Sequence, residues 1–132
     1  MSSVLLDTHI WIWLIQAPEN LTPSVLKKFE DPRTKLYLSV ASIWEIAIKT
    51  RLGKLKLPEP AGAYVPKQNR LLGIEDLPIS SSHAFKSAEL PTVHSDPFDR
   101  LLISTALVEG LPIATADPVF KKYEVELIFC KR

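Results

Sequence analysis

A chain of 132 residues, 46% of them hydrophobic, is large enough to bury one core, so we expect a single domain over residues 1–132. The formal net charge of +1 provides no overall field that would attract nucleic acid or an acidic membrane, so a polyanion would have to be bound by a local patch. The one cysteine, Cys130, excludes an internal disulfide, and we see neither a signal peptide nor an apolar stretch of the roughly 20 residues that span a bilayer. These features predict a cytoplasmic protein that does not enter a membrane.

Short apolar runs alternate with helix signals along the chain. The first run, 4–6, ends at Asp7 as a buried parallel strand does, and the helix expected over 10–15 is apolar on nearly every side, which favours contact with another chain. The next predicted elements are a helix over 24–30 capped by Thr22, a strand over 36–38, and a helix over 43–48 that is capped by Ser39 or Ser42 and ends at Gly53.

The second half of the chain continues the alternation. Pro58, Pro60 and Pro66 predict a linker in the segment 57–73, with a broken or late-starting helix over 64–72. The elements expected after it are a strand over 74–79, helices over 80–90 and 97–109, and strands over 112–115 and 125–129. Strands that alternate with helices predict a three-layer α/β/α domain with a mainly parallel central sheet.

Four acidic residues stand where such a sheet binds ligands. Asp7 and Asp117 directly follow predicted strands, Asp99 lies in the first turn of a helix, and Glu45 lies inside the helix after the second strand. Ionised carboxylates about 5 Å apart repel by roughly 3 kcal/mol per pair at an effective dielectric near 20, so a cluster needs protons or a cation. Oxygen-only ligands suit Mg²⁺ or Mn²⁺ better than zinc.

Each acid also has a purely structural interpretation. An aspartate before a helix is often its N-cap, which is the favoured interpretation for Asp96 and an even alternative for Asp7 and Asp117. Glu45 lies in mid-helix among apolar residues and cannot cap anything. Its alternative role is an ion pair with Lys49, four residues on.

Four short motifs follow one another over residues 4–117. They are Val4-Leu5-Leu6-Asp7-Thr8-His9, Ser42-Ile43-Trp44-Glu45-Ile46-Ala47-Ile48-Lys49, His94-Ser95-Asp96-Pro97-Phe98-Asp99-Arg100-Leu101-Leu102-Ile103 and Ala114-Thr115-Ala116-Asp117. No single motif is specific, but in this order they resemble the PIN-domain ribonucleases found as toxins of bacterial and archaeal VapBC-type toxin–antitoxin pairs.

The resemblance implies a PIN-like nuclease domain with an acidic metal site. It implies that one or two Mg²⁺ or Mn²⁺ ions are held by Asp7, Glu45 and Asp99, with Asp117 as a more variable fourth ligand. The residues expected to support these ligands from beside them are Asp96, Thr8 and Thr115. The resemblance further implies endonucleolytic hydrolysis of RNA by a metal-activated water, inhibition by a small antitoxin and a homodimer.

Basic residues near the acids are candidates for binding RNA phosphates. Lys49, Arg51 and Lys54 follow Glu45 closely, although a solvated helix end explains them equally well. Arg100 is a further candidate, but an ion pair with Asp96 at i,i+4 is slightly favoured.

Other functions fit the sequence less well. Phosphatases with a nucleophilic aspartate after the first strand generally need a second one two positions on, where this chain has His9. A PIN scaffold that binds RNA or a protein without cutting stays open as the alternative. The spacing of the histidines matches no zinc site. For His9 and His94, which flank the motifs, a surface or core role is favoured, and a contact with the site is the alternative.

Overall fold

Five parallel strands form a sheet in the computed structural model, which describes residues 2–92, 94 and 96–131. Their order across the sheet is β3-β2-β1-β4-β5. The strands are β1 (Ser2–Leu6), β2 (Thr34–Ser39), β3 (Ile74–Leu77), β4 (Ile113–Thr115) and β5 (Leu127–Phe129). The predicted parallel sheet is confirmed.

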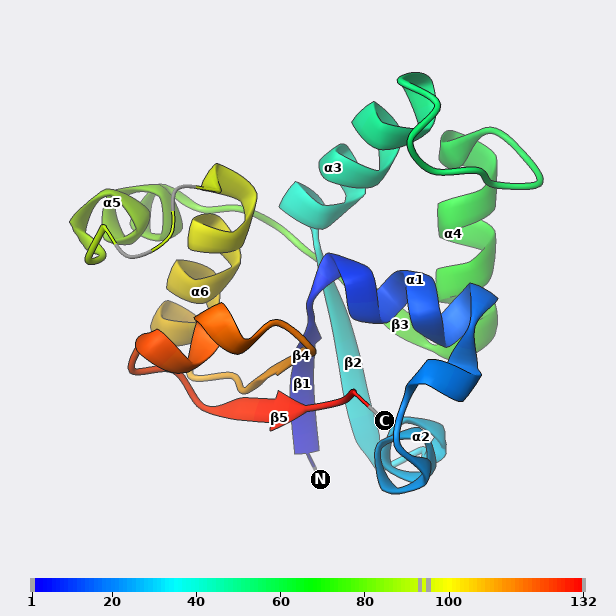
Figure 1. Ribbon diagram of the computed structural model, residues 1–132, viewed down its shortest axis with the longest axis horizontal. Helices are drawn as coiled ribbons and strands as arrows, with labels where there is room; N and C mark the ends of the chain where they lie inside the picture. Colours follow the sequence, from blue (N-terminus) through cyan, green and yellow to red (C-terminus); the bar gives the residue numbers. More distant parts are fainter. Residues whose placement is uncertain (1, 93, 95, 132) are drawn as a thin grey trace.

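Helices cover both faces of this sheet (Figure 1). The helices are α1 (Thr8–Gln16), α2 (Pro23–Glu30), α3 (Val40–Arg51), α4 (Ala61–Leu72), α5 (Ser81–Glu89) and α6 (Pro97–Glu109), with short 3₁₀ turns η1 (Pro18–Asn20) and η2 (Pro118–Lys122). None of the helices in the described part of the chain is long and apolar enough to cross a membrane.

The alternation of side chains along β1 divides the core into two layers. Val4 and Leu6 pack on one face against α1, α2, α3 and α4, whereas Leu5 packs on the other face against α6 and η2. The side chains of Val4, Leu5 and Leu6 are all fully buried. Because successive strand residues point to opposite faces, three adjacent apolar residues are what a strand covered on both sides requires.

Several predicted boundaries were wrong. The helix expected over 64–72 begins at Ala61, because Pro66 removes only one backbone bond near the start of α4 while Tyr64 and Val65 are buried beside it. The strand expected over 74–79 ends at Leu77, and that expected over 125–129 begins at Leu127.

Local signals set several helix ends as expected. Thr22 Oγ1 accepts from the N–H of Val25 at 3.3 Å at the start of α2. Ser39, rather than Ser42, caps α3 by accepting from the N–H of Ala41 at 3.0 Å. Gly110 ends α6 with a φ of 68°, a left-handed conformation that favours glycine.

A buried polar pair joins α1 to α4. Trp11 Nε1 donates to Asn69 Oδ1 at 2.7 Å, and both residues are buried. Asn69 Nδ2 has no hydrogen-bond partner in the described part of the chain. Replacing either residue with an apolar one would leave the other with a buried polar atom that has lost its partner, which would destabilise the fold.

We therefore expect Trp11→Phe and Asn69→Leu each to lower the free energy of unfolding by about 1–4 kcal/mol, because each leaves a buried polar atom unpaired. The double variant should lose less than the sum of the single variants, since it removes both polar groups together. Urea denaturation of the four proteins checks this coupling. Strict additivity would contradict it.

Candidate active site

Asp7 lies at the carboxyl end of the central strand β1. Its carboxylate is buried and accepts a bond from Thr115 Oγ1, at the end of β4, at 2.8 Å. No side-chain cap from Asp7 to α1 is present among the described residues. Thr115 Oγ1 also accepts from the N–H of Asp117 at 3.1 Å, so one hydroxyl links these two acids.

Asp96 and Asp117 serve as helix caps and also line the site. Asp96 Oδ1 accepts from the N–H of Phe98 at 2.9 Å, which agrees with the favoured structural interpretation. Asp117 Oδ1 accepts from the N–H of Val119 at 3.0 Å. Capping uses one oxygen of each carboxylate, so it does not prevent the other from facing a ligand.

Glu45 is buried on α3 with an exposed fraction of only 7%. Its Oε2 forms the expected ion pair with Lys49 Nζ at 3.1 Å, but its Oε1 has no partner in the described part of the chain. An unpartnered carboxylate oxygen in a buried position is costly. The ion pair with Lys49 therefore does not fully account for Glu45.

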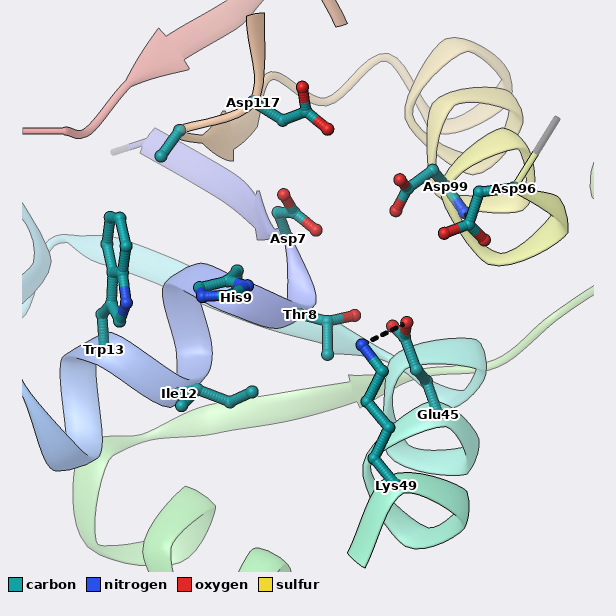
Figure 2. A pocket seen from close by; sticks show the side chains of 11 residues that line it. Asp7, Thr8, His9, Ile12, Trp13, Glu45, Lys49, Asp96, Asp99 and Asp117 are labelled. Carbon is teal, nitrogen blue, oxygen red and sulfur yellow. Dashed lines mark hydrogen bonds and ion pairs between the residues drawn. The ribbon is translucent and has the colours of Figure 1, made fainter. Parts of the chain in front are cut away.

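One open cavity of about 340 Å³ gathers the predicted acids. Figure 2 shows Asp7 near the centre of the view, with Asp117 above it, Asp99 to its right and Glu45 below and to the right. The lining residues are Asp7, Thr8, His9, Ile12, Trp13, Glu45, Lys49, Asp96, Asp99, Ala116 and Asp117. The fold thus brings together Asp7, Glu45, Asp99 and Asp117, which lie far apart in the sequence.

Burial makes ionisation of this cluster unfavourable. The pKa of Asp7 is raised to about 7, chiefly because the carboxyl is buried and secondly because Asp99 is nearby. The pKa of Asp99 is raised to about 6, again mainly by burial, although the hydrogen bond with His94 opposes the rise. A cation in the cavity would remove this penalty.

Thr8 ties the start of α1 to α3. Its hydroxyl donates to Ser42 Oγ at 2.8 Å, and both side chains are buried. Because Asp7 precedes α1 and Glu45 belongs to α3, this bond fixes the two acids relative to each other. Thr8 therefore lies beside the acids, and its role in supporting them stays a prediction.

The basic residues expected to bind RNA lie in three different places. Lys49 lines the cavity, whereas Arg51 and Lys54 are exposed beyond it. Arg100 Nη1 and Nη2 donate to the backbone carbonyls of Ser87, Leu90, Pro91 and His94, at 2.8–3.2 Å.

The two roles expected for Arg100 are therefore corrected. It forms no ion pair with Asp96 within the described residues, and its terminal N–H groups are occupied by carbonyls rather than free for phosphate. It caps the C-terminal end of α5 and also binds the carbonyl of His94, ahead of α6. Carbonyls left unpaired at a helix end attract a guanidinium, because it offers several donors in one plane.

His94 contacts the acid cluster, which the sequence offered only as the less favoured alternative. Its Nε2 lies 2.7 Å from Asp99 Oδ2, so the favoured surface or core role was wrong. One ligand atom each from His94, Asp99 and Asp117 lie within 4.8 Å of one another. Ser95, which belongs to the same motif, lies outside the described residues. The only signal for His94 was its position five residues before Asp99.

The fold and the acidic cavity define a PIN-type protein. The family described as PIN domain matches residues 4–126, and the chain belongs to this family. Ribonuclease VapC22 of Mycobacterium tuberculosis is 27% identical over 89% of this chain and 88% of its own length. Ribonuclease VapC16 of the same organism is 48% identical, but over only 41% of this chain and 38% of its own length.

A solved structure agrees in fold over nearly the whole chain. It is that of VapBC2 from Rickettsia felis bound to a DNA fragment from its promoter, with a TM-score of 0.76. The match covers 98% of this chain and 99% of that one at 18% identity. At this identity the likeness establishes the α/β fold.

The raised pKa values of Asp7 and Asp99 predict how stability depends on pH. Both pKa values lie above the value of about 4 that an aspartate has in the unfolded chain, so the folded protein binds more protons than the unfolded one. The free energy of unfolding of the metal-free protein should therefore fall as pH rises from about 4 to 7. Asp7→Asn should remove roughly 2–4 kcal/mol of this fall. Urea denaturation at pH 4.5 and 7.5, compared between wild type and variant, checks the sign. Identical pH dependence in both proteins would contradict it.

Arg100→Lys should lower the free energy of unfolding by about 1–3 kcal/mol, because one ammonium group cannot serve four carbonyls. Arg51→Lys is the matched control, since Arg51 is exposed and should tolerate the change within about 0.5 kcal/mol. Equal stability of the two variants would contradict the capping role.

Proposed function

We propose that this chain is a metal-dependent endoribonuclease and the toxin of a toxin–antitoxin pair. The observation that carries the proposal is the cavity in which four acids from separate elements of a PIN domain meet. Relatives named ribonuclease VapC support RNA as the substrate. We take residues 1–132 as one nuclease unit.

The donor set fits a divalent cation. Asp7, Glu45, Asp99 and Asp117 would hold one or two ions of the hard type, Mg²⁺ or Mn²⁺, and the unpartnered Glu45 Oε1 is an oxygen still available to bind one. The bound cation would supply an activated water and would stabilise charge on the phosphate oxygens. Hydrolysis of this kind leaves 5′-phosphate and 3′-hydroxyl ends.

The chain's own residues orient the acids and meet the substrate. Thr115 orients Asp7 through its hydroxyl, and Thr8 holds α1 against α3. Lys49 stands at the cavity with a side chain that is 42% exposed, so it can pair with Glu45 and also bind a substrate phosphate. Arg51 and Lys54 extend this positive edge beyond the end of α3 and would bind the RNA backbone further along.

Partners and location follow from the same proposal. The likeness to VapBC complexes supports a small antitoxin protein as partner, and we propose a homodimer as the assembled form. The single cysteine is buried and free, which fits the reducing cytoplasm. The alternative, a scaffold that binds RNA without cutting it, is disfavoured because the acid set is complete.

The test is cleavage of RNA by purified protein with Mg²⁺ or Mn²⁺, followed by mapping of the new ends. Asp99→Asn should reduce the rate at least about 100-fold, because a ligand in the cavity is lost while its shape is kept. Asp76→Asn is the control, since Asp76 is exposed and lies outside this cavity.

Three outcomes would overturn the proposal. Cleavage that persists in excess EDTA would exclude the metal, and 2′,3′-cyclic phosphate ends would exclude attack by water. RNA binding by wild type without cleavage under any divalent cation would instead establish the inactive scaffold.

A further inference from the structure

His94 lies between α5 and α6, beside Asp99 and Asp117, two of the acids that line the cavity. Its Nε2 contacts Asp99 Oδ2 at 2.7 Å, and its side chain is 20% exposed. Ligand atoms of His94, Asp99 and Asp117 lie within 4.8 Å of one another. Ligands about 2.1 Å from one ion lie at most about 4.2 Å apart, so small side-chain rotations would place all three on a common ion.

The backbone holds His94 in place. Its carbonyl accepts from Arg100 Nη1 at 3.2 Å, and the same guanidinium binds the end of α5. The backbone of His94 is therefore tied to α6 by its own carbonyl. An imidazole on a fixed backbone loses less conformational entropy when it binds a ligand.

An ion pair with Asp99 alone does not account for the arrangement. Asp117 uses only Oδ1 for its cap, and one of its carboxylate oxygens lies within 4.8 Å of a ring nitrogen of His94. Across the same cavity, Glu45 Oε1 is buried and has no partner among the described residues. This separate observation indicates that the cavity is suited to bind a cation in addition to Lys49.

We propose that His94 is a nitrogen ligand of the metal site, together with Asp99 and Asp117, and that it biases the site toward Mn²⁺ over Mg²⁺. The inference rests on the proposed function in placing a cation among these acids. It changes the expected donor set from oxygen only to mixed nitrogen and oxygen.

The chemical reason lies in the two ions. Mg²⁺ binds oxygen ligands and waters and gains little from an imidazole. Divalent transition metals accept nitrogen donors in addition to carboxylates, and their affinity for mixed sites follows the Irving–Williams order. An imidazole ligand added to carboxylate ligands therefore raises the affinity for Mn²⁺ while leaving that for Mg²⁺ nearly unchanged.

The first measurement is calorimetric titration of the full chain with Mn²⁺ and with Mg²⁺ at one pH. Wild type should bind Mn²⁺ more tightly, and His94→Gln should weaken Mn²⁺ about tenfold or more while Mg²⁺ changes less than about twofold. Retained Mg²⁺ binding also shows that the variant folds. His9→Gln is the matched control, because His9 lines the same cavity but packs edge-on against Trp13, and it should keep wild-type affinity for both ions.

The second measurement is pulsed electron paramagnetic resonance of bound Mn²⁺ in protein labelled with ¹⁵N-histidine. Coupling from a directly bound nitrogen should appear in wild type and His9→Gln and disappear in His94→Gln. Its absence in wild type would overturn the inference and leave His94 as a hydrogen-bond partner of Asp99.

The two proposals fail in different ways. If wild type binds neither ion, both the metal-dependent nuclease and the His94 ligand are wrong. If wild type and His94→Gln bind Mn²⁺ equally and without nitrogen coupling, only the inference about His94 is wrong.

Discussion

The mutual repulsion of carboxylates in one buried cavity is the constraint on which the rest of this protein depends. Taking even one carboxylate from water is unfavourable, and a second charge nearby adds to the penalty, as the raised pKa values of Asp7 and Asp99 show. A fold can hold such a cluster only if it stabilises each acid separately while the cation is absent. The elements around the cavity meet this requirement with four different devices. The partners are Thr115 for Asp7, Lys49 for Glu45, His94 for Asp99 and the N–H of Val119 for Asp117.

These partners are weak enough to be replaced or shared. A hydroxyl and a backbone N–H donate one bond each, and the Lys49 side chain is 42% exposed, so water screens its pairing with Glu45. A divalent cation would offer each acid a stronger interaction. The oxygen that would gain most from a cation is the unpartnered Glu45 Oε1. The positive side chain of Lys49 lies in the same cavity because it offsets the charge of Glu45.

The order of the strands places the acids. Because β1 lies between β2 and β4 and all three run in parallel, their carboxyl ends meet at one edge of the sheet. Asp7 follows β1, Thr115 ends β4, and α3 with Glu45 begins directly after β2 (Figure 1). Only Asp99 comes from outside these strand ends, at the first turn of α6. Its position depends on Asp96, which caps α6, and on Arg100, which binds the carbonyl of His94 ahead of that helix.

The sequence by itself determined the parallel α/β fold, most helix ends and the acids, because these depend on local features: runs of apolar residues, capping side chains and a charge in mid-helix at Glu45. The tertiary structure alone decided which residues accompany the acids. His94 lies in no helix or strand, yet its imidazole contacts Asp99, and two of the four carbonyls bound by Arg100, those of Ser87 and Leu90, belong to the end of another helix. No periodicity encodes such contacts, since they depend on how α5 and α6 pack together. Pro66 gives the same lesson in α4, where burial of neighbouring side chains outweighed a local helix-breaking signal.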